Sequence, residues 1–198
     1  MASTARATTW SVAVLTSLLA LSAAAPSGAS QRFKVTGGQV KVNCPLTVGG
    51  SFEATTDAVN GELALKPEGA LDGELAVDLT GIDTGIGLRN THTREKYLEV
   101  QKGPEYATAR LTDIVLEGTS SEAPEGDVTF KGVFHLHGQN QPIEGKARLL
   151  KEGAGYRVTA SFPVEVQAYG IEKPRYLGVG VKDVVQVNVE LQAEPVNG

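Results

Sequence analysis

Few side chains in this sequence could take part in chemistry, and Arg89 and His92 are the first pair to consider. The two stand three positions apart at the predicted start of a helix, so their side chains share one face. With the free backbone N–H groups of a helix start, they could dock an anionic or carbonyl group. The alternative is structural, with Arg89 pairing with Asp83 or Asp78 to hold the helix in place. The residue types leave both interpretations open.

A second pair, His135 and His137, stands two positions apart on a predicted strand, so both side chains point to the same side. Two imidazoles on one side could serve as metal ligands. Their parity is opposite to that of Phe134 and Leu136, however, and no third ligand is close in the sequence. We therefore interpret the histidines as a solvent-facing pair and predict no metal site.

The remaining reactive groups form no catalytic set. Residues 84–87 read Thr-Gly-Ile-Gly, but no lysine follows and no parallel strand–helix unit surrounds them, which argues against a phosphate loop. Cys44, the only cysteine, has the apolar parity of its strand. We interpret it as a buried, inert thiol, although a thiol that faced a ligand cavity would be reactive. The serines lie mainly before residue 31 and at 120–121, away from any histidine, so we predict no enzyme.

The elements that position these residues are mostly strands, because apolar and polar residues alternate along much of the chain. The segment 106–116 is also strand-like in composition, although its apolar residues fall on both parities. Residues 88–100 break the alternation, and their spacing predicts a single helix of about three turns. The predicted strands cover 33–48, a short stretch around Phe52, 59–65, 75–79, 106–116, 128–136, 143–149, 156–168 and 185–191.

Eight or nine antiparallel strands with one helix indicate an all-β sandwich or closed barrel. The apolar face consists of Val, Leu, Ala and a few Phe, with almost no charge, and no tryptophan follows residue 10. If these side chains all meet in a close-packed core, the protein is an inert scaffold. If they surround a cavity, that cavity would accept an elongated hydrocarbon rather than a polar molecule.

Composition and the N-terminal segment limit the choice of partners. The 198 residues fit one domain, and 18 Lys and Arg against 23 Asp and Glu supply no basic field, so we predict no nucleic-acid binding. Residues 1–30 combine Arg6, an uncharged run at 12–21 and small residues at 22–30, a pattern typical of a secretory signal peptide. We expect cleavage within 25–30 and export of the single domain 31–198.

Four short motifs resemble those of the YceI-like family. Residues 82–92 read Ile-Asp-Thr-Gly-Ile-Gly-Leu-Arg-Asn-Thr-His, similar to the family's Ile-Asp-Thr-Gly and Arg-Asp-x-His signature. Segments 49–52, 138–143 and 168–171 resemble its other turns in order and spacing, so the resemblance covers nearly all of 33–193. The departures are Asn90 in place of Asp, no histidine near 42–44, and a proline shifted to Pro104.

The resemblance implies an antiparallel eight-stranded lipocalin-like barrel with one short α-helix, in a bacterial periplasm or outside the cell. Its interior would hold a polyisoprenoid or the tail of an isoprenoid quinone, and no other cofactor is expected. Arg89 and His92 would then contact the head group. The residues expected to contact the tail are Val42, Cys44, Leu63, Leu75, Val77, Leu79, Phe130, Phe134, Leu136, Phe162, Val164 and Tyr169.

The expected partner is therefore a hydrophobic lipid, and the interpretation is compatible with transient membrane contact and with a homodimer formed through the barrel mouth. The rival hypothesis is a non-enzymatic structural or stress-related barrel whose interior is packed shut.

Overall fold

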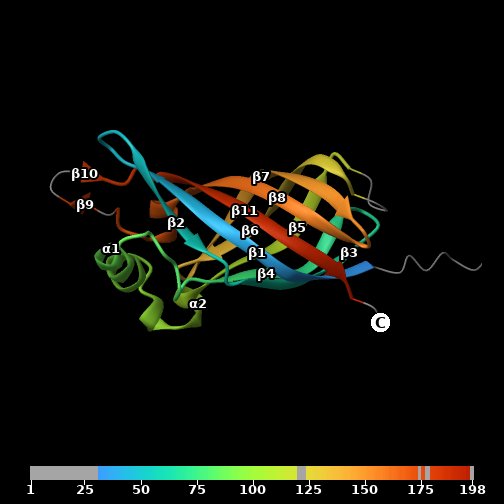
Figure 1. Cartoon of the computed structure of the whole chain (residues 1–198), viewed down its shortest axis with the longest axis horizontal. Coiled ribbons are helices and arrows are strands. Elements are labelled where there is room, and N and C mark those ends of the chain that lie inside the picture. The colour runs from blue at the N-terminus through green and yellow to red at the C-terminus, as the bar shows by residue number, and fades with distance from the viewer. Residues whose placement is uncertain (1–30, 120–123, 174, 177–178, 197–198) are drawn as a thin grey trace, which may run out of the picture.

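The chain folds into a closed antiparallel barrel (Figure 1). The computed structural model describes residues 31–119, 124–173, 175–176 and 179–196. Eight strands pair in the ring order β11-β8-β7-β6-β5-β4-β3-β1, and pairing between β1 and β11 closes the ring. The predicted all-β eight-stranded barrel is confirmed, whereas the predicted signal peptide, residues 1–30, lies outside the described residues.

The nine main strands agree in number with the sequence pattern, although their bounds differ from the apolar runs, and the predicted strand 156–168 already ends at Glu165. The main strands are β1 Gln31–Pro45, β2 Ser51–Thr56, β3 Val59–Leu65, β4 Ala70–Asp78, β5 Thr108–Glu117, β6 Gly126–Leu136, β7 Gln139–Glu152, β8 Gly155–Glu165 and β11 Val184–Pro195. A separate two-residue ladder joins β9 Arg175–Tyr176 to β10 Val179–Gly180. The helical segments are α1 Gly87–Thr91, the π-helical η1 His92–Tyr97, η2 Val100–Lys102, α2 Pro104–Ala107 and η3 Val166–Tyr169.

Strand β1 is long enough to have two partners on one edge. Its first residues pair with β3, with Phe33 opposite Leu63, and its last residues pair with β2, with Val42 opposite Ala54. Strand β2 therefore extends the wall beyond the eight-stranded ring. The bridge between Thr55 and Asp83 connects β2 to the loop that leads into α1.

A β-bulge in β1 changes which residues face the interior. Val35 is buried, the register with β11 shifts between Val35 and Gly37, and Val40 is buried further along the strand. The backbones approach so closely here that a Cβ on Gly38 would lie 2.5 Å from the main-chain oxygen of Glu190. Gly37 and Gly38 therefore lie inside one continuous strand, where the register shifts.

A second bulge explains the mixed parity of the segment 106–116. The register between β5 and β6 shifts between Thr112 and Val115, and Asp113 has a positive φ of 51°. Ala109 before the bulge and Ile114 after it are both buried, although one is odd and the other even. One extra residue thus returns the apolar side chains to the interior.

The helical segments gather at one end of the barrel, with the β1–β2 hairpin and β9–β10, whereas the C-terminus lies at the opposite end (Figure 1). The predicted single helix over 88–100 is confirmed as a helix but is shorter: α1 and η1 together end at Tyr97. Glu99 adopts a left-handed conformation with φ of 51°, which interrupts the helix before η2. Val48 is a second correction, since β1 ends at Pro45 and Val48 is 69% exposed in the hairpin loop.

Candidate functional site

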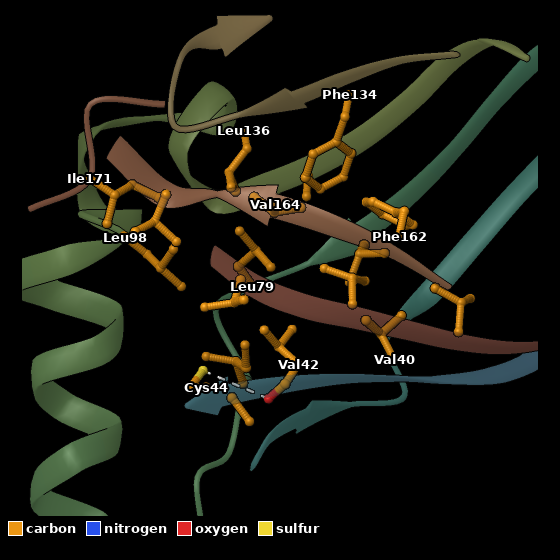
Figure 2. Close-up of a pocket in the computed structure, with 18 of the residues that line it drawn as sticks. Val40, Val42, Cys44, Leu79, Leu98, Phe134, Leu136, Phe162, Val164 and Ile171 are labelled. Atoms are coloured by element: carbon orange, nitrogen blue, oxygen red, sulfur yellow. Dashed lines mark hydrogen bonds between the residues drawn. The ribbon is translucent and has the colours of Figure 1, made fainter. Parts of the chain in front are cut away.

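The helix-side half of the barrel contains an apolar cavity of about 190 Å³ (Figure 2). Figure 2 shows side chains from opposite walls converging on it, among them Val42, Leu79, Leu136 and Val164. The walls come from β1 to β6, β8 and β11, whose alternation turns every second side chain inward. Among the described residues, Arg110 is the one charged residue in the lining, and its guanidinium pairs with the exposed Glu74 on the outer surface.

Nine of the predicted tail-contacting residues line this cavity, namely Val42, Cys44, Leu75, Val77, Leu79, Phe134, Leu136, Phe162 and Val164. Their contact with a ligand stays a prediction. The remaining lining residues were not among the predicted contacts: Val40, Phe52, Ala54, Val59, Ile82, Thr93, Tyr97, Leu98, Ala109, Arg110, Leu111, Val166, Ile171, Val181, Val185, Val187, Val189 and Leu191. Many of these have the same parity on strands that the alternation did predict, so the pattern itself could have found them.

Five predicted contacts lie elsewhere in the structure. Phe130 and Tyr169 are buried in the core beside Phe162 and Phe134, and Leu63 packs against the same core. The other two, Arg89 and His92, belong to the helical cover, and neither lines the cavity.

The helical segment closes one end of the cavity. Thr93, Tyr97 and Leu98 contribute to the lining from this side. Arg94 holds the segment to the barrel, because its Nε and Nη2 both donate to the main-chain oxygen of Ile82, at 2.9 and 2.7 Å. The end of the barrel is thus covered by a helix whose inward residues are apolar.

Arg89 lies at the rim of the cavity. Its guanidinium carbon is 4.2 Å from the centroid of the Phe52 ring, which is itself part of the lining, and its Nη2 donates to the Thr84 carbonyl at 2.6 Å. Among the described residues, its buried Nε has no hydrogen-bond partner. His92, by contrast, is exposed. The structure therefore does not place the two side chains together toward one ligand group, as the sequence led us to expect.

Asn90, rather than Arg89, is the partner of Asp83. The Asn90 Nδ2 donates to the Asp83 carboxylate at 2.6 Å, while its Oδ1 accepts from the Thr84 N–H and hydroxyl. The hydrogen bond from Asn90 lowers the pKa of Asp83, and the hydrogen bond from the Gly85 N–H adds a smaller effect in the same direction. An ionised Asp at position 90 could not donate in this way. The proposed pairing of Arg89 with Asp83 or Asp78 is therefore wrong.

Cys44 faces the cavity from β1 (Figure 2). Its Sγ donates weakly to the Val42 carbonyl at 3.7 Å. Burial raises the pKa of the thiol to about 11, against a smaller opposing effect of the Arg89 charge. The thiol is therefore protonated at neutral pH, as expected of the buried, inert alternative, even though it faces the cavity.

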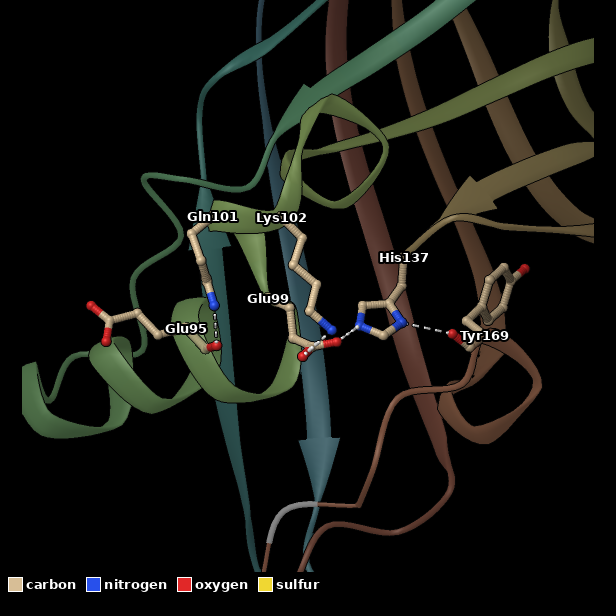
Figure 3. A network of polar contacts seen from close by, with 6 residues as sticks. All are labelled: Glu95, Glu99, Gln101, Lys102, His137 and Tyr169. Carbon is tan, nitrogen blue, oxygen red and sulfur yellow. Dashed lines mark hydrogen bonds and ion pairs between the residues drawn. The ribbon is translucent and has the colours of Figure 1, made fainter.

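His137 is a correction to the sequence interpretation, because it is buried rather than solvent-facing (Figure 3). Strand β6 ends at Leu136, and His137 adopts a left-handed conformation with φ of 53° in the turn. Its Nδ1 lies 3.0 Å from the Tyr169 main-chain oxygen and its Nε2 lies 3.0 Å from the Glu99 carboxylate. Glu99 also pairs with Lys102 at 2.6 Å.

This network joins three segments that are distant in sequence: the end of the helical cover, the β6–β7 turn and η3. Its polar atoms satisfy one another, which is the structural role expected of buried polar groups.

Within the described residues, no three His, Cys, Asp or Glu side chains are grouped closely enough to hold a metal ion. None of the described helices is long and apolar enough to cross a membrane.

Comparison with known proteins supports the same fold. A polyisoprenoid binding domain from Saccharophagus degradans, implicated in plant cell wall breakdown, is 16% identical, with a TM-score of 0.60 over 83% of this chain and 98% of that one. BcnA of Burkholderia cenocepacia is 15% identical, with a TM-score of 0.61 over 77% and 95%. The YCEI protein of Campylobacter jejuni is 10% identical, with a TM-score of 0.52 over 71% and 82%.

No curated protein matches the chain. The YceI-like domain model matches residues 24–193, which includes nearly every element of the barrel and its helical cover. Over this range the chain belongs to the YceI-like family.

Proposed function

We propose that this barrel binds the hydrocarbon tail of an isoprenoid or similar amphiphile and shields it from water. The observation that carries the proposal is the cavity, whose lining is almost wholly apolar. A polar solute would lose its hydrogen bonds with water on entering, whereas a hydrocarbon would lose none. The similarity to a polyisoprenoid binding domain supports the same class of ligand. The proposal includes no catalytic step.

The size of the cavity sets the scale of binding. An apolar cavity of about 150 Å³ accepts one benzene, so 190 Å³ corresponds to roughly seven or eight carbon atoms. At about 0.8 kcal/mol for each buried methylene, their transfer from water contributes about 6 kcal/mol before the costs of association. This contribution supports measurable binding without any hydrogen bond to the tail.

We place the head group of the ligand beside Arg89. The Arg89 Nε is buried and has no partner among the described residues, and the guanidinium stacks on a ring that lines the cavity. A quinone carbonyl or a phosphate oxygen would accept a hydrogen bond there. Arg89→Gln should weaken binding of a quinone, whereas Arg148→Gln, a matched removal of a cation on β7, which does not line the cavity, should not. Equal affinities of both variants and the wild type would refute this placement.

The central test uses a variant that fills the cavity. Val42→Phe adds a ring to the lining, and Lys41→Phe adds the same ring to the outer side of the same strand. Binding of a short-tailed ubiquinone, measured by isothermal titration calorimetry, should weaken at least tenfold in the first variant only. The purified protein should also release a lipid into organic solvent, detected by mass spectrometry. No extractable lipid and no ubiquinone binding would favour the packed structural barrel.

We also propose that the chain is exported to the periplasm or the exterior, because residues 1–30 have the pattern of a signal peptide. N-terminal sequencing of the native protein should begin within residues 26–31, and retention of Met1 in the mature protein would contradict export by cleavage.

Lipid exchange would bring the helix end of the barrel to a membrane. Ile86 and Leu88, at 54% and 70% exposed, present apolar side chains there. Leu88→Glu should reduce sedimentation with lipid vesicles, while Val115→Glu, in β5, should not. Equal sedimentation would refute this contact.

A homodimer formed through the helix end of the barrel would appear as a doubled mass in light scattering. Leu88→Glu should abolish the doubled mass, and a monomeric wild type would exclude the dimer.

A further inference from the structure

The cavity extends along only part of the barrel. On β6, Phe134 and Leu136 line it, but Val128 and Phe130, which are also buried and have the same parity, do not. None of the described residues of β7 contributes to the lining. On β6 the hollow therefore ends between Phe134 and Phe130, whereas on β11 the lining continues to Leu191.

Three aromatic rings form the floor of the cavity. The Phe162 ring meets Phe134 and Phe130 edge to face, with centroid distances of 5.3 and 5.9 Å. Phe134 and Phe162 contribute to the lining, and Phe130 lies behind them with an exposed fraction of 4%. Edge-to-face pairs at these distances are favourable, so the three rings support one another as a unit.

The Phe130 ring occupies a gap left by a glycine on the neighbouring strand. A Cβ on Gly145 would lie 2.5 Å from the Phe130 Cε1 and 2.7 Å from the Ser161 main-chain oxygen. The ring thus rests on the bare backbone of β7 and cannot move farther toward that wall. This contact limits how far the floor can yield toward β7.

Behind the floor, the barrel is filled by its own side chains. Phe33 and Tyr156 meet edge to face at 5.4 Å, and Val128 and Leu149 are buried in the same core. A tail that lies in the cavity, with its head group beside Arg89, would therefore meet the floor before it reaches these residues.

We propose that Phe130 and Phe162 limit the length of the tail that this barrel encloses; the inference rests on the proposed function. The enclosed volume corresponds to roughly seven or eight carbons, which is less than two full isoprene units. Each carbon up to this limit gains by leaving water, and carbons beyond it remain outside the cavity. The ligand class is therefore an amphiphile with a short isoprenoid or alkyl tail.

The experiment compares ubiquinones with one, two, three and four isoprene units by isothermal titration calorimetry at matched detergent concentration. For the wild type, the affinity should rise at least tenfold from one unit to two and change less than threefold thereafter. In Phe130→Ala and Phe162→Ala, the rise should continue to three units. Phe33→Ala, a matched loss of a ring behind the floor, should behave as the wild type does.

Phe130→Leu provides a milder change if the alanine variants do not fold, and it should also raise the affinity for the three-unit tail relative to the wild type. Affinity that rises steadily to four units in the wild type, or the same limit in every folded floor variant, would overturn the length limit and leave tail binding intact. Absence of binding for every chain length would refute the proposed function and this inference together.

Discussion

Alkylation of Cys44 measures how well the cavity excludes water. Burial raises the pKa of this thiol from an ordinary 9.0 to about 11. At pH 8, the reactive thiolate is then about 0.1% of the population rather than about 9%, a reduction of roughly ninety-fold. We expect iodoacetamide to modify Cys44 more slowly by at least that factor, because access to a half-buried side chain is also restricted.

The control places a cysteine on the opposite side of the same strand. In Lys41→Cys combined with Cys44→Ser, the only thiol is solvent-exposed and should react at the rate of a free cysteine. Mass spectrometry of timed samples gives both rates. A bound ubiquinone should slow the reaction of Cys44 further and leave the rate of the control variant unchanged. A Cys44 rate within tenfold of the control would refute the sealed cavity.

The same pKa shift predicts how stability depends on pH. Because the folded protein holds the thiol at a raised pKa, the contribution of Cys44 to stability is complete below pH 9 and is lost as pH rises toward about 11. Thermal melts of the wild type should therefore fall more steeply over this range than those of Cys44→Ser. Arg89→Gln should raise the thiol pKa further, because it removes the nearby positive charge. Parallel curves for the wild type and Cys44→Ser would contradict the shift.

Two further predictions concern the fold. Gly145→Ala should lower the free energy of unfolding by about 1–3 kcal/mol, because the added Cβ overlaps the Phe130 ring, whereas Gly81→Ala, with open space around it, should change it little; equal denaturation midpoints in urea would contradict the tight contact. The hydrogen-bonded ion pair with Lys102 lowers the pKa of Glu99. The stability contributed by the ionised Glu99 is therefore present above its ordinary pKa of 4.5 and is lost as the pH falls below that value. Glu99→Gln should remove this part of the acid dependence of the melting temperature, and an unchanged acid profile would argue against it.

The strands were predictable because each separates an apolar interior from water, which imposes a period of two on the sequence. The pattern fails where the backbone changes register. At Asp113 a single extra residue reverses the parity, and in β1 the register shifts between Val35 and Gly37. A glycine or an aspartate inside an apolar run is the available signal for such a bulge, but it does not distinguish a bulge from a turn.

The site was only partly predictable. Parity assigns Val42 and Phe162 to the interior, and both line the cavity. Parity also assigns Phe130 to the interior, without showing that this ring packs against its neighbours rather than lining a space. That difference depends on how rings from separate strands meet. His137 was misplaced because the alternation in the sequence continues one residue beyond the end of β6, and only its left-handed φ takes it off the strand. The inward face of Tyr97 was hidden by the charged residues around it.

The pairing that closes the ring joins the first strand to the last, from Phe33 opposite Pro195 to Asn43 opposite Gln186. A chain that is still being synthesised cannot form this pairing before β11 emerges, because β11 is the last of the ring strands in the sequence. Until then β1 and β8 each have an exposed edge, which can associate with other chains. The slowest and most aggregation-sensitive moment of folding should therefore be the arrival of β11, and deletion of this strand would leave the ring open.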